Sequence, residues 1–353
     1  MNKTYYKDLM MIPGISSHES RVRAYMKKVM EKHAHLEIIQ DKLGSIFAYK
    51  KSKNPNAKTV LIAGHMDEVG LMVKSILPNG GIKVLPIGGL SGDVFISQLM
   101  YVYTKDGKKI PGVFGSIPPH LKQSNQTDID DLVFDTGARS KEEVLKMGIN
   151  LGDMIIFDTP FEESADGTRF MAKSIDNRYG CALSLELIDE IANIDLPYNL
   201  AIGATVQEEV GLRGAETATN LFKPDMFIAL DASPVNDLFD KTSMAKLGNG
   251  FLLRIIDPRN IMLTGLRSYF ENLANRYKIK YQAYVSMGGT DAAKAIDMHE
   301  GILATTIGLP ARYIHSSVAM AEWSDVEAAR NMVLALIHDL TPEIIDSLKE
   351  SNR

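Results

Sequence analysis

Four apolar runs that end near acidic or histidine residues constrain the fold of this chain more than any other feature. The runs cover residues 59–64, 200–206, 226–230 and 303–308, and each has the length and composition of a buried β-strand. Polar residues follow them: His65 and Asp67, Glu208 and Glu209, Asp231, and His315. In an open α/β sheet, ligands bind in the crevice outside the carboxyl ends of the strands. We therefore expect these side chains to share one hollow.

The other secondary-structure signals predict an α/β fold. Residues 58–64 are almost continuously apolar, which is typical of a strand covered on both faces. Capping-box patterns at Ser16/Glu19 and Ser324/Glu327 predict the starts of the first and the last helix. Residues 22–30 carry the apolar spacing of the first helix, further strands are expected at residues 36–39 and 45–50, and further helices at residues 180–194 and 266–277. This alternation predicts a mostly parallel central sheet flanked by helices.

The pattern of secondary-structure signals changes after about residue 70 and returns to strand–helix alternation after residue 170. Short β-like runs are separated there by turn signals, at residues 98–104, 109–114, 131–134 and 153–157, and only residues 141–147 have a helical pattern. This indicates a small β-rich domain inserted into the α/β chain. We expect residues 1–69 and 163–353 to form the two parts of the α/β domain and residues 70–162 to form the insert.

Composition excludes several functional classes. The formal net charge is -5 and no stretch is rich in Lys and Arg, which argues against a nucleic-acid partner. No run reaches the roughly 18 apolar residues that span a bilayer, so no membrane association is expected. Cys181 is the single cysteine, so no intramolecular disulfide can form, and it is expected to be a small residue of a buried helix. Together with an N-terminus that lacks an apolar core, this predicts a cytoplasmic protein.

The candidate residues suit a catalytic metal site. Carboxylates and imidazoles without thiolates are typical of catalytic rather than structural zinc sites. With Asp176, which precedes a predicted helix, there are more ligands than one ion needs, and two ions bridged by one carboxylate would use them all. Glu208, beside Glu209, would then be free to act as a general base, and Asp67 could accept the second ring N–H of His65. Each residue taken alone could also have a purely structural role. Asp231 could cap a turn, and a histidine after a strand is often a partly buried, hydrogen-bonded residue.

Five motifs resemble those of the M42 metallo-aminopeptidases, in the same order along nearly the whole chain. They are His65-Met66-Asp67-Glu68-Val69-Gly70, Ser174-Ile175-Asp176-Asn177-Arg178, Gln207-Glu208-Glu209-Val210-Gly211-Leu212-Arg213-Gly214-Ala215, Leu230-Asp231-Ala232-Ser233 and Arg312-Tyr313-Ile314-His315-Ser316, with Gly288-Gly289-Thr290-Asp291 as a further match. The resemblance implies that Asp176 bridges two metal ions. It gives His65 and Asp231 to one ion, and Glu209 and His315 to the other. Glu208 would be the base, and Asp67 would orient His65.

The resemblance also implies an activity and an assembly. It predicts a fold of the zinc-exopeptidase type with a PDZ-like dimerisation domain, and homo-oligomers from dimers to a tetrahedral dodecamer. The substrates would be short peptides with a free N-terminus, and the cofactors two divalent ions per subunit, zinc or cobalt first and manganese as a further option. Arg254 could receive an acidic N-terminal side chain, which predicts a weak preference for Glu and Asp. Met287 could instead line an apolar pocket, which would suit broad or hydrophobic specificity.

Two other functions are compatible with the same residues. A related di-metal hydrolase could act on an acylamino acid or a dipeptide, because the sheet and the ligand types would serve either reaction. A non-catalytic scaffold could keep the fold, but it would have no need for the adjacent pair Glu208 and Glu209. His120, after two prolines in the inserted segment, is expected to be a loop residue or a subunit contact rather than a metal ligand.

Overall fold

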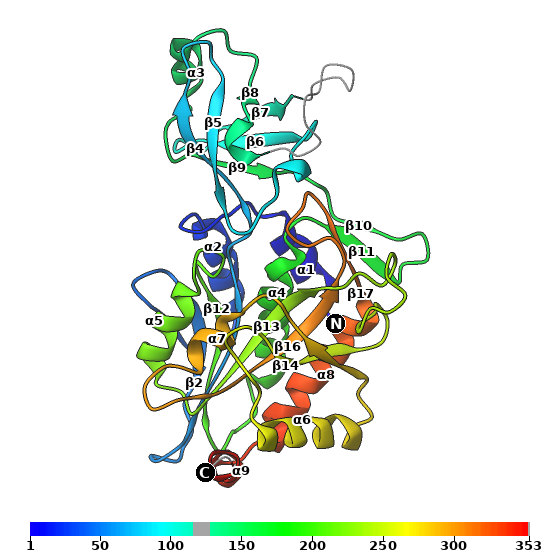
Figure 1. Ribbon diagram of the computed structural model, residues 1–353. Helices are drawn as coiled ribbons and strands as arrows, with labels where there is room; N and C mark the ends of the chain where they lie inside the picture. The colour runs from blue at the N-terminus through cyan, green and yellow to red at the C-terminus, as the bar shows by residue number, and fades with distance from the viewer. Residues whose placement is uncertain (116–127, 352–353) are drawn as a thin grey trace.

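The structure is a computed structural model that describes residues 1–115 and 128–351 (Figure 1). An eight-stranded sheet forms the centre of its α/β part. The strands lie in the order β1 (Glu37–Gln40), β2 (Ile46–Lys50), β12 (Asn199–Thr205), β3 (Thr59–His65), β13 (Met226–Pro234), β16 (Leu303–Ala311), β14 (Phe251–Ile256) and β15 (Tyr281–Val285). The four runs that the sequence marks as buried strands are thus neighbours at the centre of the sheet.

The centre of this sheet is parallel, and so is the pair β14–β15 at one edge. β12, β3, β13 and β16 pair in parallel, whereas β2 is antiparallel to β12 and β14 is antiparallel to β16. The sheet as a whole is therefore mixed, and the prediction of a mostly parallel sheet holds for its central strands. β1 and β2 are joined only by residues 41–45, a connection too short for the crossover that parallel neighbours need.

Helices cover both faces of the sheet. Successive residues of a strand point to opposite faces, and in β3 Val60 and Ile62 belong to one buried cluster while Leu61 and Ala63 belong to another. The larger cluster includes residues of α1 (Lys3–Met11), α2 (Ser20–Met30), α4 (Ile175–Ile191), α6 (Thr264–Arg276), α8 (Trp323–Asp339) and α9 (Pro342–Glu350). The smaller one includes residues of α5 (Arg213–Phe222) and α7 (Asp291–Ala295). None of these helices is long and apolar enough to cross a membrane.

Neither predicted capping box forms. α2 begins at Ser20, and the hydroxyl of Ser16 donates instead to the carboxylate of Asp67 at 2.6 Å. The carboxylate of Glu19 accepts from the backbone N–H groups of Ser17 and Gln207. At the other end of the chain, α8 begins at Trp323, one residue before the predicted cap, and no side chain caps it. Ser16 and Glu19 therefore form tertiary contacts near the strand ends instead of a helix cap.

The inserted segment forms a closed barrel, which stands above the α/β part in Figure 1. Its order is β4 (Gly70–Ile76), β5 (Ile82–Ile87), β8 (Phe134–Asp135), β7 (Lys109–Phe114), β6 (Leu99–Tyr103) and β9 (Met154–Phe157). α3 (Lys141–Met147) and the 3-10 turns η1 (Gly92–Val94) and η3 (Ile129–Asp131) complete it. Its interior is a separate apolar cluster that includes Leu71, Phe95 and Phe134. His120 lies outside the described residues.

A small three-stranded sheet follows the barrel. It consists of β10 (Glu162–Glu163), β11 (Arg169–Ala172) and β17 (Ala319–Glu322). β17 begins shortly after His315, and β11 ends shortly before Asp176. The sheet therefore holds together two segments that carry candidate residues and are far apart in the sequence.

Candidate metal centre

The carboxyl ends of the central strands bring the predicted residues to one edge of the sheet. They are His65 at the end of β3, Glu208 and Glu209 after β12, Asp231 within β13, Asp176 in the first turn of α4, and His315 between β16 and β17. The register pairs His65 with Thr205 and Asp231 with Gly308, so the neighbouring strand ends lie side by side. These six residues all line one cavity of about 450 Å³, whereas Asp67 lies behind it.

Asp176 lies between the two histidines of this cavity. Its Oδ1 is 3.2 Å from Nε2 of His65, and its Oδ2 is 3.3 Å from Nε2 of His315. Nε2 of His65 is 3.7 Å from Oδ1 of Asp231, and Nε2 of His315 is 3.6 Å from Oε1 of Glu209. Two sets of potential ligand atoms result, one of His65, Asp176 and Asp231 and one of Asp176, Glu209 and His315, each within 4.8 Å. The two sets share Asp176.

Glu208 lies beside these sets but belongs to neither of them. Its Oε2 is 3.7 Å from Nε2 of His65, and it forms a third group with His65 and Glu209. It is 9% exposed and faces the cavity. A carboxylate in this position can reach a molecule in the cavity without being required by either of the sets that contain Asp176.

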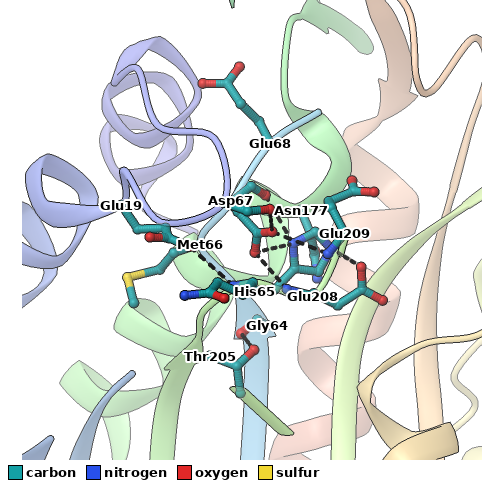
Figure 2. A network of polar contacts seen from close by, with 12 residues as sticks. Glu19, Gly64, His65, Met66, Asp67, Glu68, Asn177, Thr205, Glu208 and Glu209 are labelled. Atoms are coloured by element: carbon teal, nitrogen blue, oxygen red, sulfur yellow. Dashed lines mark hydrogen bonds and ion pairs between the residues drawn. The ribbon is translucent and has the colours of Figure 1, made fainter. Parts of the chain in front are cut away.

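Asp67 holds the turn that carries the two glutamates. Its carboxylate accepts hydrogen bonds from the backbone N–H groups of Glu208 and Glu209 at 3.0 and 3.1 Å (Figure 2). It also accepts one from the hydroxyl of Ser16. Nδ1 of His65 is 3.0 Å from the main-chain oxygen of Asp67 and 3.5 Å from its Oδ1. The ring N–H of His65 thus meets Asp67 mainly at its backbone carbonyl, while the carboxylate fixes Glu208 and Glu209.

Burial and like charge disfavour the ionised form of three of the carboxyl groups. Burial raises the pKa of Glu208 and of Asp231, and neighbouring carboxylates raise both further. Burial also raises the pKa of Glu209 to about 8, with the charge of Asp176 adding to the effect. Burial acts in the same direction on Asp176, but hydrogen bonds from His315 and His65 outweigh it and hold the pKa of Asp176 well below its usual range.

A divalent cation fits this set of donors. Oε1 of Glu209 is buried and has no hydrogen-bond partner among the described residues. Carboxylate oxygens and imidazole nitrogens are common ligands of zinc, cobalt and manganese, and a cation would relieve the repulsion that raises the pKa values. Cys181 does not take part: its Sγ is buried behind the site, 3.1 Å from the main-chain oxygen of His65, and burial raises its pKa to about 12. It is an inert core residue, as predicted.

Sequence reasoning missed several residues that support the site. Ser16 and Glu19 were assigned to a helix cap, although they contact Asp67 and Gln207. A buried group behind the cavity was not predicted at all. There Glu68 binds Lys173 at 2.7 Å, and Arg178 donates to the main-chain oxygens of Leu9, Ile12, Gly14 and Met66. The available signal was the position of Arg178 directly before the apolar run at residues 179–183 of α4.

Arg254 and Met287 have different surroundings. Arg254 is 5% exposed, lines the cavity, and donates to the main-chain oxygen of Gly288 and to the hydroxyl of Ser233. Its guanidinium is 3.7 Å from Asp257. Met287 is 90% exposed and is not among the cavity-lining residues, so it does not form an apolar pocket as the sequence suggested.

Carboxylates and imidazoles at the strand ends of an open α/β sheet are typical of metal-dependent hydrolases. The comparisons with known proteins narrow this class. The model of the M42 glutamyl aminopeptidase family matches residues 44–332, and the chain belongs to this family of peptidases, which are hydrolases. Membership of this metallopeptidase family implies divalent metal ions.

Curated relatives match over almost their whole length. A glutamyl aminopeptidase of Lactococcus lactis is 41% identical over 97% of this chain and 98% of its own. A lysyl aminopeptidase of Pyrococcus furiosus is 32% identical over 95% and 96%.

Solved structures agree with the fold. A TET aminopeptidase from a Thaumarchaeota archaeon has a TM-score of 0.93 with 33% identity and 98% coverage of both chains. The TET1 peptidase of Pyrococcus horikoshii, which can assemble into a tetrahedron or a large octahedral shell, has a TM-score of 0.86 with 28% identity over 96% of this chain and 99% of its own.

Proposed function

We propose that this protein is an aminopeptidase that uses two divalent metal ions per subunit to release the N-terminal residue of short peptides. The observation that carries the proposal is the position of Asp176, whose two oxygens face different histidines at 3.2 and 3.3 Å. A carboxylate in that position suits a bridge between two ions. His65 and Asp231 would complete one ligand set, and Glu209 and His315 the other. Zinc or cobalt, or else manganese, would suit these ligands.

The reaction would need a general base, and it would need the turn that carries Glu208 and Glu209 to stay in place. When bound, the ions would act as Lewis acids toward the scissile carbonyl and the attacking water. Glu208 would take a proton from that water and pass it to the nitrogen of the leaving peptide, so that no net proton is gained or lost by the enzyme. Asp67, through its contacts with the backbone of Glu208 and Glu209, would keep both carboxylates in place during this transfer.

A weak preference for acidic N-terminal residues is the finer part of the proposal. Arg254 is the positive charge of the cavity wall, and its Nε has no hydrogen-bond partner among the described residues. The relative with 41% identity is named as a glutamyl aminopeptidase, which supports this preference. The preference is weak because Asp257 already faces the guanidinium and because another relative is named for lysine. Ala232, Pro234 and Ile314 line the same cavity and favour the alternative, a broad or hydrophobic specificity.

We also propose how the chain is organised and assembled. Residues 70–162 would be a PDZ-like dimerisation domain, inserted between residues 1–69 and 163–353 of a catalytic domain of the zinc-exopeptidase type. Dimers would assemble further into a tetrahedral dodecamer, because a TET relative assembles into closed shells. A cytoplasmic location remains a prediction that rests on the sequence.

One experiment tests reaction, metal and specificity together. The protein is stripped of metal with a chelator, reloaded with Zn²⁺, Co²⁺ or Mn²⁺, and given a panel of peptides that differ in the N-terminal residue. Each peptide is offered with a free and with an acetylated amine. We expect hydrolysis only after reloading, only with the free amine, and fastest with N-terminal Glu or Asp.

The same panel separates the alternatives. Equal cleavage of acetylated peptides would support the related acylamino hydrolase instead. Cleavage of dipeptides alone would support a dipeptidase. A protein that binds metal but cleaves nothing in the panel would support the scaffold. Turnover that survives complete removal of metal would refute the metal mechanism itself.

A further inference from the structure

A main-chain oxygen of the barrel contacts one of the two candidate histidine ligands. Nδ1 of His315 is 2.7 Å from the carbonyl oxygen of Gly89, in the loop between β5 and η1. A carbonyl oxygen only accepts, so Nδ1 donates to it, and in the neutral ring the lone pair would then lie on Nε2, which faces Asp176 and Glu209. This is the form in which a histidine ligates a metal ion.

The two histidines differ in what holds them. His65 is 2% exposed, ends a central strand, and has its Nδ1 against the carbonyl of Asp67 only two residues further along. The side chain of His315 is 33% exposed and lies in an irregular loop at a positive φ of 58°. The orientation of His315 therefore depends on a contact with another part of the molecule, whereas that of His65 is local.

Gly88 brings the same barrel loop against a second candidate ligand. It has a φ of +87°, and a Cβ atom at this position would lie 2.9 Å from Oε2 of Glu209 and 2.7 Å from a methyl carbon of Val69. Real Cβ atoms do not approach other heavy atoms this closely, so a side chain at residue 88 would press on both Val69 and the carboxylate of Glu209. The absence of a side chain thus leaves room for its carboxylate.

An apolar contact fixes the position of this loop. Ile87, the last residue of β5, belongs to a buried cluster with Ile15, Met154 and Ile156, and Val210 packs against it. Val210 directly follows Glu209, and Ile15 precedes Ser16 in the segment that contacts Asp67. At the barrel exit, the hydroxyl of Thr159 donates to the main-chain oxygen of Ser317, two residues after His315. The inserted segment therefore meets the segment of His315 at Gly89 and Thr159, and the segment of Glu209 at Gly88 and Ile87.

We propose that the Gly88–Gly89 loop of the barrel is a positioning element of the metal site formed by Asp176, Glu209 and His315. Its carbonyl fixes the ring of His315, and its lack of a side chain admits the carboxylate of Glu209. The inference rests on the proposed two-metal function and adds to it that the two ion positions differ. One depends on the docking of the barrel, and the other, at His65 and Asp231, is held within the α/β part alone.

The test compares two glycines of the barrel in the full-length protein. Gly88 and Gly107 have nearly the same backbone angle, with φ of +87° and +86°, but a Cβ at Gly107 meets nothing within 4 Å. Gly88→Ala and Gly107→Ala therefore carry the same backbone strain, and only the first disturbs Glu209. Binding of Co²⁺ is measured by competition with a chromophoric chelator and by the absorption spectrum of the bound ion.

We expect wild type and Gly107→Ala to bind two ions per subunit with affinities within about twofold of each other. Gly88→Ala should bind one ion as tightly as wild type and the other about 10- to 100-fold more weakly, the usual cost of disturbing the groups that orient a ligand. Ile87→Ala, which loosens the loop without reaching a ligand, should weaken the same ion about threefold or more. Thermal melts show which variants fold. If Gly88→Ala does not fold, the affinities of Ile87→Ala decide the test.

Two unchanged affinities in the folded variants would overturn the proposal, and so would an equal loss at both ion positions. Failure of the underlying function has a different signature, because it appears in the wild-type protein. A wild type that binds no second ion, or that hydrolyses peptides after chelation, would reject the two-metal function whatever the variants do.

Discussion

The central sheet and the barrel contribute to the candidate metal centre in different ways. The sheet and its flanking helices supply side chains at strand ends, such as His65, Glu209 and Asp231. Among the described residues, the barrel, which has its own apolar core, supplies no candidate ligand side chain and contributes a carbonyl oxygen and the space above a glycine. The sheet therefore determines which chemistry is available, and the barrel influences how one half of the site is oriented. If this comparison is right, substitutions in the sheet should affect chemistry more strongly than equivalent substitutions in the barrel.

Replacement of the proposed base should have the largest effect. Glu208→Gln keeps the size of the side chain but removes the proton acceptor, and it alters neither of the ligand sets that share Asp176. We expect kcat to fall by about 10²- to 10⁴-fold, the usual contribution of a general base, while the number of bound ions stays unchanged. Peptide hydrolysis and metal content are measured on the same preparation.

His315→Ala is the companion variant, since it should lose metal as well as activity. A Glu208→Gln protein with near wild-type turnover would reject the assigned base. A Glu208→Gln protein without metal would instead make Glu208 a ligand. Glu208 could then no longer be separated, as the base, from the residues that bind metal.

Removal of one charge behind the ligands should have the next largest effect. Asp67→Asn leaves one of the backbone N–H groups of Glu208 and Glu209 without its carboxylate acceptor. We expect metal affinity or kcat to fall about 10- to 100-fold, as for other residues that orient metal ligands. The matched variant in the barrel is Asp153→Asn, because Asp153 is also buried and also accepts a backbone N–H, that of Asn150.

Asp153→Asn should leave metal affinity and kcat within about twofold of wild type, since Asp153 does not line the cavity. Equal losses in the two variants would mean that both report a general loss of stability. The comparison between sheet and barrel would then have no basis in these residues.

The sequence predicts the part of the site that depends on side chains and strand ends. His65, Glu208 and Asp231 could be placed together because parallel strands end at the same edge of a sheet, and the structure does bring them together. Contacts made by the main chain could not be predicted in this way. Gly89 has no side chain to signal a role, and its contact with His315 joins residues 226 positions apart.

The fold could also be predicted only in part from the sequence. The insert was predicted as β-rich, but β4 and β5 were not among its predicted strands, because Lys74, Ser75 and Pro86 interrupt their apolar pattern. In a closed barrel the outward-facing positions are free to be polar, so apolar runs are short. The capping box at Ser16 and Glu19 failed for a related reason, since the same oxygens that cap a helix can accept or donate in a tertiary contact.

Replacement of the cavity arginine should change specificity more than rate. Arg254→Met removes the positive charge from the cavity wall and keeps an unbranched side chain there. We expect kcat/KM for N-terminal Glu to fall about tenfold relative to N-terminal Leu, which is about 1.4 kcal/mol. The control is Arg312→Met, because Arg312 pairs with Asp237 and does not line the cavity. An unchanged Glu-to-Leu ratio in Arg254→Met would remove the acidic preference and leave the broad specificity.

The smallest effect is expected at Ser16, the most remote residue of the network behind the ligands. Its hydroxyl donates to Oδ2 of Asp67 at 2.6 Å, while two backbone N–H groups still hold the same carboxylate. Loss of one such hydrogen bond costs about 1 kcal/mol, so Ser16→Ala should lower kcat about fivefold. Ser52→Ala is the control, because the Ser52 hydroxyl donates to the main-chain oxygen of Leu196, away from the cavity-lining residues.

Ser16→Ala and Ser52→Ala should both lower thermal stability, because each loses a partly or fully buried hydrogen bond that the hydroxyl donates, and Ser52→Ala also loses the acceptor of the Asn54 backbone N–H. Only Ser16→Ala should lower kcat, since only its partner holds the turn of Glu208 and Glu209. A fall in kcat that is equal in both variants would show that activity follows overall stability. A fall in Ser16→Ala alone would show that the N-terminal segment acts on the site through Asp67.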